Sequence, residues 1–372
     1  MGTFFVYTFV VLASYILASN AVRTYEIGYL KKAKHNMMFI ILILSFVSGF
    51  RGYSVGTDTQ TYAKLFLNYG NHKHLEVGFR YFIQFLMQIM YNPTFVFVVI
   101  AIIINGLFIV TLWKYRDIIK FNYSVLIYSV MIYFLTFSGV RQYLVVALCF
   151  YCSTWMIKGK IKGYLLYGIV CIASTLIHTS SLAGLLLIPI FYLAYIVGNK
   201  KFTVAQFAIG ILGIFFCLGG YTALYTKLMN SYAKFLEPTF NTVSIGYMVM
   251  FKTILLFIAM LSFLTDNKRV SVLNSDEIKR INNKGTLIAV CLMTDLIYQV
   301  ICYEGYFFAS VSRIGWYYLP FEVLLYSKIL ERFREKRFFV AGIMILTVLI
   351  YSYYVMFRSD GNSIIPYVNV LW

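Results

Sequence analysis

Long apolar runs separated by short polar segments recur along the whole chain. Several approach or exceed the roughly 20 residues that a helix needs to cross a bilayer, among them residues 3–21, 93–113, 202–220, 245–264 and 338–357. A transmembrane β-barrel would instead show short segments of alternating polarity. The pattern predicts an all-α, polytopic membrane protein with a single transmembrane domain over residues 1–372.

The composition excludes a water-soluble fold. Hydrophobic residues make up 61% of the chain and charged residues only 12%, whereas soluble domains carry about 25% charged residues. The first apolar run has neither a basic region before it nor a small-residue cleavage site after it. We therefore expect residues 3–21 to be a retained first helix and not a signal peptide.

The formal net charge of +18 comes from short basic clusters between apolar runs, which indicates membrane topology and not nucleic-acid binding. One membrane topology places all six clusters in the cytoplasm, with about 12 crossings and both termini outside. The clusters are Arg23, Lys31, Lys32 and Lys34; Lys114, Arg116 and Lys120; Lys158, Lys160 and Lys162; Lys200 and Lys201; Lys268, Arg269, Lys279, Arg280 and Lys284; and Arg332, Arg334, Lys336 and Arg337.

This topology requires that residues 79–91 do not cross the membrane. The segment has about 13 residues, which is short for a span. Arg80, Gln84 and Gln88 recur on one helical face, and Asn92-Pro93 follows. We predict an interfacial or re-entrant helix here.

The external loops contain three candidates for proton transfer: Asp58, Glu76 and His178. Each also has a structural interpretation. Asp58 could cap a helix with Gln60 or Thr61, Glu76 could stabilise a helix start, and His178 could belong to a helix-start cluster with Thr179. The local sequence leaves both interpretations open.

Three separate arginines, Arg51, Arg141 and Arg313, are expected on the same outer face. The planar guanidinium suits phosphate recognition, although Arg141 could instead reach toward lipid headgroups. Arginines, carboxylates and aromatic side chains together predict a site for a phosphorylated amphiphile with a ring-containing head, such as a lipid-diphosphate sugar.

The order of short motifs along the chain resembles that of the EpsG family of Wzy-like polysaccharide polymerases. The motifs are Arg51 with Val55-Gly56-Thr57-Asp58 and Tyr62, Glu76-Val77-Gly78-Phe79, Val140-Arg141-Gln142, His178-Thr179-Ser180-Ser181, Ser312-Arg313 to Pro320, and Pro366-Tyr367. The resemblance implies a GT-C-like glycosyltransferase of the bacterial cytoplasmic membrane. Such an enzyme joins undecaprenyl-diphosphate-linked repeat units outside the membrane during exopolysaccharide, capsule or O-antigen synthesis.

We expect Arg141 and Arg313, with Arg51 as a third candidate, to bind the donor diphosphate. His178 and Asp58 are favoured over Glu76 as the base, and the stereochemical outcome is left open. Further substrate-binding candidates are Thr57, Tyr62, Gln142 and Tyr317.

The expected partners are the lipid-linked donor and acceptor, membrane lipids, a flippase and a chain-length regulator, without nucleic acid. The chain has no Asp-x-Asp pair and no His-rich cluster, and its six cysteines lie in or beside apolar runs without nearby histidines. These features indicate neither a metal site nor a cofactor.

Two alternative functions remain. A flippase or transporter of the same lipid-linked sugars would account for Asp295 and Glu322 within apolar segments, although the halves show no convincing internal repeat. A polysaccharide-modifying acyltransferase could use His178 as its base, but no motif for an acyl donor is visible.

Overall fold

The computed structural model describes residues 2–68, 75–198, 284–298, 314–336, 364 and 366–370. The chain divides into two compact units. The first contains Met1–Met156, Lys160–Ile188 and Val323–Trp372, and the second contains Ile157–Gly159 and Pro189–Glu322. The division concerns local packing, so the single transmembrane domain stays a prediction.

The described residues are largely helical, and the pairing between strands there is limited to one isolated bridge. The α-helices of the first unit are α1 (Gly2–Glu26), α2 (Leu30–Gly49), α3 (Thr59–Leu67), α4 (Val77–Ile89), α5 (Pro93–Lys114), α6 (Phe121–Met131), α7 (Val140–Ser153) and α8 (Ile161–Ala173). Short 3-10 segments complete this unit at η2 (Tyr133–Phe137), η3 (Ser174–Leu176) and η4 (Thr179–Leu186).

Three further helical segments lie wholly or partly in the second unit. Residues 284–298 are helical, whereas α9 (Leu187–Gly198) and α14 (Leu319–Lys336) each continue from one unit into the other. We describe the two units separately.

Within the described ranges, three helical segments are long and apolar enough to cross a membrane: Gly2–Glu26, Pro93–Lys114 and Thr179–Ile196. The first two confirm the helices predicted over residues 3–21 and 93–113. The apolar runs at 202–220, 245–264 and 338–357 lie outside the described residues. The all-α class is confirmed for the described chain, while about 12 crossings and a GT-C-like fold stay predictions.

The core of the first unit is built from aromatic and aliphatic side chains of α5, α6 and α7, with α1 packed on α2 and α6. Asn105 of α5 provides a buried polar centre. Its amide donates to Ser45 Oγ at 3.3 Å and its carbonyl accepts from Tyr128 Oη at 2.8 Å. The amide is therefore satisfied inside an apolar bundle, as burial requires.

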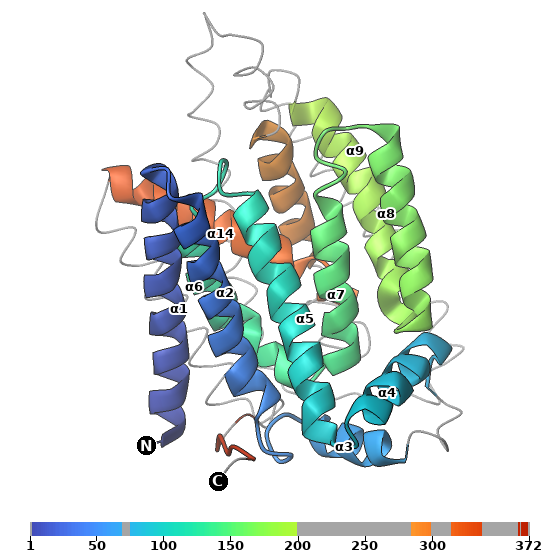
Figure 1. The fold of residues 1–372 in the computed structure, drawn as a ribbon. Coiled ribbons are helices and arrows are strands. Elements are labelled where there is room, and N and C mark those ends of the chain that lie inside the picture. The colour runs from blue at the N-terminus through green and yellow to red at the C-terminus, as the bar shows by residue number, and fades with distance from the viewer. Residues whose placement is uncertain are drawn as a thin grey trace, which may run out of the picture. The chain divides into compact units, whose positions relative to one another are not determined.

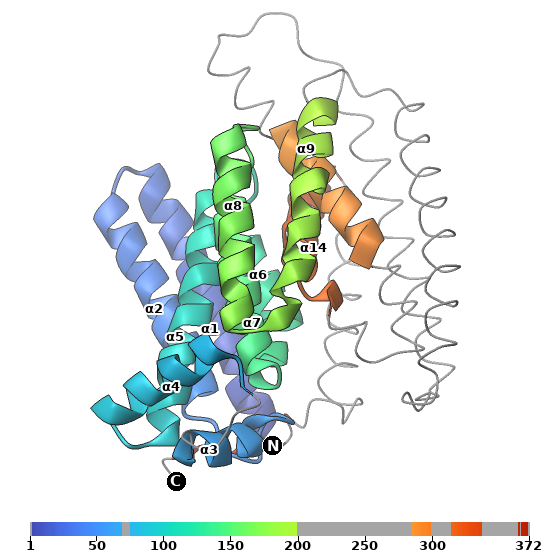
Figure 2. The same ribbon diagram turned by 90° about the vertical axis from the view of Figure 1, so that its right-hand side faces the viewer.

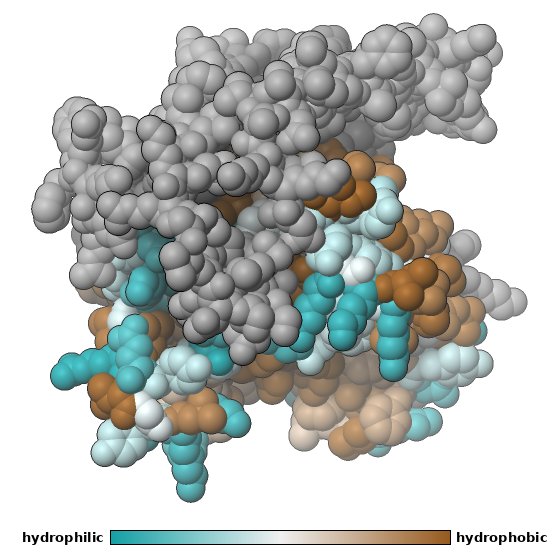
Figure 3. Space-filling model, turned by 90° about the horizontal axis from the view of Figure 1, so that it is seen from above, coloured by the Kyte–Doolittle hydropathy of each residue, from teal (hydrophilic) through white to brown (hydrophobic). Residues whose placement is uncertain are grey.

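The first unit has two chemically different ends (Figure 1). The end that carries α3 and α4, also the end where residues 2 and 366–370 lie, we call the site end. The opposite end, which we call the basic end, contains the α1–α2 and α5–α6 turns and is viewed from above in Figure 3. Lys34, Lys114 and Lys120 lie at these turns. The predicted separation of basic clusters from the candidate residues is therefore present in this unit.

Helix α4 lies across the site end and does not run along the bundle (Figures 1 and 2). Its 13 residues span about 20 Å, less than the roughly 30 Å of a hydrocarbon core. Phe79 and Ile83 on one face are buried, whereas Tyr81 and Phe85 on another are exposed. This arrangement agrees with a segment that does not cross, and its place at the membrane surface stays a prediction.

Candidate functional site

An ion pair between Glu76 and Arg141 joins three helix starts at the site end. Arg141 Nη1 contacts Glu76 Oε2, and the other carboxylate oxygen, Oε1, accepts from the backbone N–H of Thr179 at 3.4 Å. The side chains of Arg141 and Glu76 are 21% and 16% exposed. Glu76 precedes α4, Arg141 lies in the first turn of α7 and Thr179 begins η4, so one carboxylate holds all three elements together.

The position of Arg141 explains its need for a carboxylate. The start of a helix is its positive end, and Gly139 provides no side-chain cap there. A guanidinium in this first turn is unfavourable unless a negative group compensates it. Glu76 supplies that charge. It stands at the N-cap position of α4, as the helix-start interpretation expected, but its side chain makes no capping hydrogen bond to α4.

Gly78 allows α4 to approach close enough for this contact. A Cβ at this position would lie 2.8 Å from both the Leu176 carbonyl oxygen and the Leu176 Cβ. Phe79, the next residue, is fully buried against Tyr62 and Phe66. The motif that begins at Glu76 therefore combines a charge, a close backbone contact and an aromatic anchor.

Tyr62 of α3 contacts Arg141 from a second side. Its hydroxyl accepts from Arg141 Nε at 2.7 Å, and the guanidinium carbon lies 5.7 Å from the Tyr62 ring centroid. Burial raises the pKa of Tyr62, while the Arg141 charge opposes that rise. The hydroxyl therefore stays neutral near pH 7. Among the described residues Nη2 of Arg141 makes no hydrogen bond, so one face of the fork can bind a ligand.

Asp58 stands at the N-cap position of α3, but its side chain makes no capping hydrogen bond. It is half-buried, and its charge contributes to the raised pKa of Tyr62. Neither of the cap pairs expected for Asp58 forms. In the described part of the chain its carboxylate has no hydrogen-bond or ion-pair partner, which leaves it able to accept a proton.

The loop before Asp58 is held by backbone contacts. Thr57 is exposed, and its N–H donates to Ser138 Oγ at 3.3 Å. Gly56 has a φ of +93°, and a Cβ there would lie 2.4 Å from the Phe137 carbonyl oxygen. Only glycine satisfies both conditions, so the loop that carries Asp58 is fitted to the end of η2.

Arg51 has a different environment from Arg141. It is 3% exposed, and its guanidinium donates to the carbonyl of Ser48, to Thr59 Oγ1 at 3.2 Å and to the Phe137 carbonyl at 3.2 Å. Phe97 also packs over it, with its ring centroid 4.8 Å away. Burial lowers the pKa of Arg51 to about 10, so it remains charged at neutral pH. These contacts favour a structural role over the diphosphate-binding role expected for Arg51.

His178 is the N-cap of η4, as the helix-start interpretation expected. Its Nδ1 accepts from the Ser180 backbone N–H at 3.2 Å and lies 2.9 Å from Ser180 Oγ. Because a backbone N–H can only donate, the Nδ1 lone pair is engaged and the proton of the neutral ring is on Nε2. Neutral His178 is therefore a hydrogen-bond donor at Nε2 and not a base at that atom.

The remaining candidates lie in the interior of the first unit, in the second unit, or outside the described residues. Gln142 is 3% exposed, which places its side chain in the protein interior. Tyr317, Asp295 and Glu322 are buried and belong to the second unit, and Arg313 lies outside the described residues. No group of three metal-ligating side chains occurs within the ranges that the structure describes.

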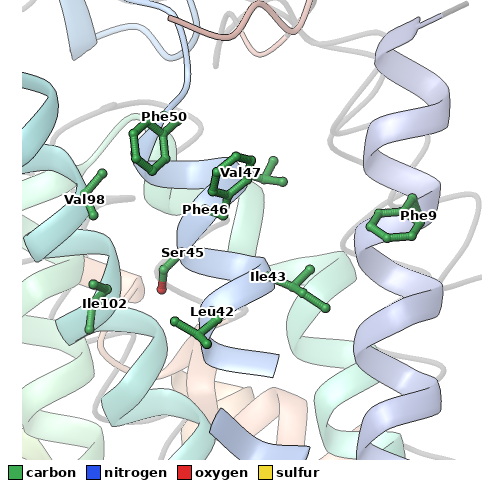
Figure 4. A pocket seen from close by; sticks show the side chains of 9 residues that line it. All are labelled: Phe9, Leu42, Ile43, Ser45, Phe46, Val47, Phe50, Val98 and Ile102. Atoms are coloured by element: carbon green, nitrogen blue, oxygen red, sulfur yellow. The ribbon is translucent and has the colours of Figure 1, made fainter. Parts of the chain in front are cut away.

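An apolar groove of about 380 Å³ opens between α1, α2 and α5 (Figure 4). Ser45 is its one polar lining residue; the others are Phe9, Leu42, Ile43, Phe46, Val47, Phe50, Val98 and Ile102. None of them is a candidate for chemistry. The site is therefore defined by the polar cluster around Arg141 and not by this groove.

Sequence reasoning missed two members of the cluster. The backbone N–H of Thr179 binds Glu76, and the hydroxyl of Ser138 binds the backbone of Thr57. Thr179 belongs to the motif that begins at His178, but a backbone donor has no residue-type signal, and Ser138 meets Thr57 across 81 positions of sequence. Their roles follow from helix ends that meet in space.

The first unit and its charged cluster define an α-helical membrane protein with a polar site at one end of its bundle. The chain belongs to the EpsG family, a family of Wzy-like polymerases, whose profile matches residues 35–369. This match covers nearly the whole chain and confirms the resemblance. No curated protein and no solved structure matches the chain.

Proposed function

We propose that this protein is a polysaccharide polymerase, a glycosyltransferase that joins oligosaccharide repeat units carried on undecaprenyl diphosphate. The reaction takes place at the outer face of the bacterial cytoplasmic membrane, where the site end faces outward. The product is an exopolysaccharide, capsule or O-antigen chain. Family membership supports the class of reaction, and the Arg141 cluster supports the residues.

The observation that carries the proposal is the guanidinium of Arg141, which is held at two of its nitrogens while the third makes no hydrogen bond with the described residues. Glu76 holds Nη1 and Tyr62 holds Nε. Nη2, which has no hydrogen bond with the described residues, donates to a diphosphate oxygen of the donor. As the anomeric C–O bond breaks, negative charge grows on the diphosphate, and a preoriented cation stabilises that charge.

Asp58 is the proposed base. A hydroxyl of the acceptor sugar attacks the anomeric carbon, the new glycosidic C–O bond forms, and the hydroxyl proton passes to the Asp58 carboxylate. Undecaprenyl diphosphate leaves with the bonding electrons of the broken C–O bond. Asp58 is preferred over Glu76 because both oxygens of Glu76 are engaged with Arg141 and Thr179.

The tautomer of His178 changes the role that the sequence predicted for it. With Nδ1 engaged by the Ser180 backbone N–H and the proton on Nε2, the neutral ring cannot take the acceptor proton. We therefore assign His178 to holding the start of η4 and not to proton transfer. Arg313 remains a proposed second diphosphate ligand from the sequence, and a flippase and a chain-length regulator remain proposed partners.

Purified protein in nanodiscs, supplied with a lipid-linked repeat unit, tests the proposal. We expect a ladder of elongated saccharides and release of undecaprenyl diphosphate without an ion gradient or nucleotide.

Arg141→Ala should abolish the ladder, and Arg141→Lys should retain little of it because a single ammonium cannot reproduce the fork. Arg23→Ala, which removes an exposed arginine in the last turn of α1, is the matched control. Movement of substrate without elongation would favour a flippase instead.

A further inference from the structure

Residues 366–370, which we call the brace, pair with the backbone that follows α2. Arg51 and Asn369 form an isolated antiparallel bridge. Two backbone hydrogen bonds flank it: Gly52 N–H to the Val368 carbonyl at 2.5 Å, and Val370 N–H to the Phe50 carbonyl at 3.0 Å. The brace therefore fixes the first residues of the loop that leads to Asp58.

Further contacts anchor the brace to α1 and α2. The Tyr367 hydroxyl donates to the Val47 carbonyl in α2 at 3.0 Å, and the Tyr367 N–H donates to Thr3 Oγ1 in α1 at 3.0 Å. The Tyr367 and Tyr7 rings also meet edge to face, with centroids 5.6 Å apart. The segment is thus held at several points, as a positioning element must be.

Arg51 carries this constraint toward the candidate site. Its guanidinium binds Thr59, the first residue of α3, and the carbonyl of Phe137 at the end of η2. Asp58 directly precedes α3, and Phe137 is three residues before the start of α7, which carries Arg141. One buried cation therefore connects α3, which follows the proposed base, with η2, the segment that leads into α7 and the proposed diphosphate ligand.

We infer that the brace is a positioning element of the active site: it fixes Arg51, and through Arg51 it holds Asp58 and Arg141 in register. None of its residues is among the groups proposed to touch substrate. The inference rests on the proposed polymerase function for its catalytic consequence. Its structural part, protection of the loop, can be measured separately.

Val370 offers a matched pair of substitutions. Val370→Pro removes the N–H that donates to Phe50, whereas Val370→Ala keeps it and trims a side chain that is 37% exposed. Because small displacements of catalytic groups are costly, Val370→Pro should lower turnover per folded molecule by about tenfold or more at saturating lipid-linked substrate. Val370→Ala should match the parent. A role in stability alone would reduce the yield of folded protein and leave this turnover unchanged.

Labelling of a cysteine introduced at position 55 gives a measurement that does not depend on activity. Val55 is fully buried in the loop, whereas Ser54 is exposed. A cysteine placed at position 55 (Val55→Cys) should react with maleimide several-fold faster when combined with Val370→Pro than when combined with Val370→Ala. The labelling of the parent chain is subtracted from both rates. The Ser54→Cys variant should be labelled equally in both backgrounds.

The two measurements separate the outcomes. Slower turnover together with faster labelling at position 55 supports the brace. Three outcomes overturn the brace as a positioning element. They are slower turnover with unchanged labelling, faster labelling with unchanged turnover, and no change in either measurement. A parent protein that makes no polymer overturns the proposed function, while a labelling difference in that protein still supports the structural part of the inference.

Discussion

Glu76 and Arg141, 65 positions apart in sequence, form an ion pair in which the carboxylate also accepts from the backbone of Thr179. The pair is mostly shielded from water, at 16% and 21% side-chain exposure. Shielding strengthens the interaction and makes loss of one partner more costly than at an exposed surface. The fixed geometry of Arg141 therefore depends on Glu76.

Glu76→Gln should keep the size of the side chain but remove the charge that compensates Arg141. We expect turnover to fall by about tenfold, which corresponds to about 1.4 kcal/mol, within the range for hydrogen bonds to charged groups. The in vitro ladder assay measures this effect. Glu76→Asp, which keeps the charge on a shorter side chain, should lie between the parent and Glu76→Gln. Equal activity of all three would show that the ion pair does not serve the reaction.

Tyr62→Phe removes the hydroxyl that accepts from Arg141 Nε and keeps the ring against Phe66 and Phe79. Loss of one hydrogen bond of about 1 kcal/mol should lower kcat/KM by about fivefold. Tyr143→Phe is a comparison within α7 that removes another buried hydroxyl. A drop that is equal for both variants would indicate general loss of packing and not a specific effect on Arg141.

Several features of the fold could be predicted from sequence because they depend on local patterns. The length and polarity of residues 79–91 predicted a short amphipathic helix, and α4 covers Val77–Ile89 and lies across the site end. That it does not cross the membrane stays a prediction. The basic clusters predicted which loops share one side, and the α1–α2 and α5–α6 turns do lie at the same end of the first unit. The placement of that end in the cytoplasm stays a prediction. These properties follow from hydrophobic periodicity and charge, which single segments reveal.

The division of roles among the arginines could not be predicted. Arg51 follows the end of α2 and Arg141 lies in the first turn of α7, both at the same end of the bundle. Only the three-dimensional packing buries Arg51 among the carbonyls of Ser48 and Phe137. The tautomer of His178 is equally hidden, because it depends on a backbone N–H two residues away. Contacts between distant segments and backbone donors leave no signature in one sequence.

The contrast between the two arginines predicts opposite phenotypes. Arg51→Lys cannot satisfy all three oxygen acceptors and should lower the free energy of unfolding by about 2–4 kcal/mol. Thermal unfolding of the detergent-solubilised protein measures this loss. Arg141→Lys should retain most of the thermal stability but lose activity. Similar thermal shifts for both variants would contradict the separate roles.

Gly56→Ala should be far more damaging than Gly28→Ala, although both glycines have positive φ, of +93° and +87°. At Gly28 nothing lies within 4 Å of an added Cβ, so the cost is backbone strain of about 1 kcal/mol. At Gly56 the added atom would also meet the Phe137 carbonyl at 2.4 Å, and the Asp58 loop must move. We expect loss of polymer for Gly56→Ala with near-parent polymer for Gly28→Ala, measured at matched protein levels.

The site end should face outward and the basic end should face the cytoplasm. Ser54 is exposed in the loop before Asp58, and Lys34 is exposed near the α1–α2 turn. In intact cells a membrane-impermeant maleimide should label the Ser54→Cys variant, whereas the Lys34→Cys variant should react only after permeabilisation. The native cysteines Cys149, Cys152, Cys171 and Cys291 are buried, and the labelling of the parent chain supplies the background. The reverse labelling pattern would place the Arg141 cluster on the cytoplasmic side. That result would contradict polymerisation at the outer leaflet.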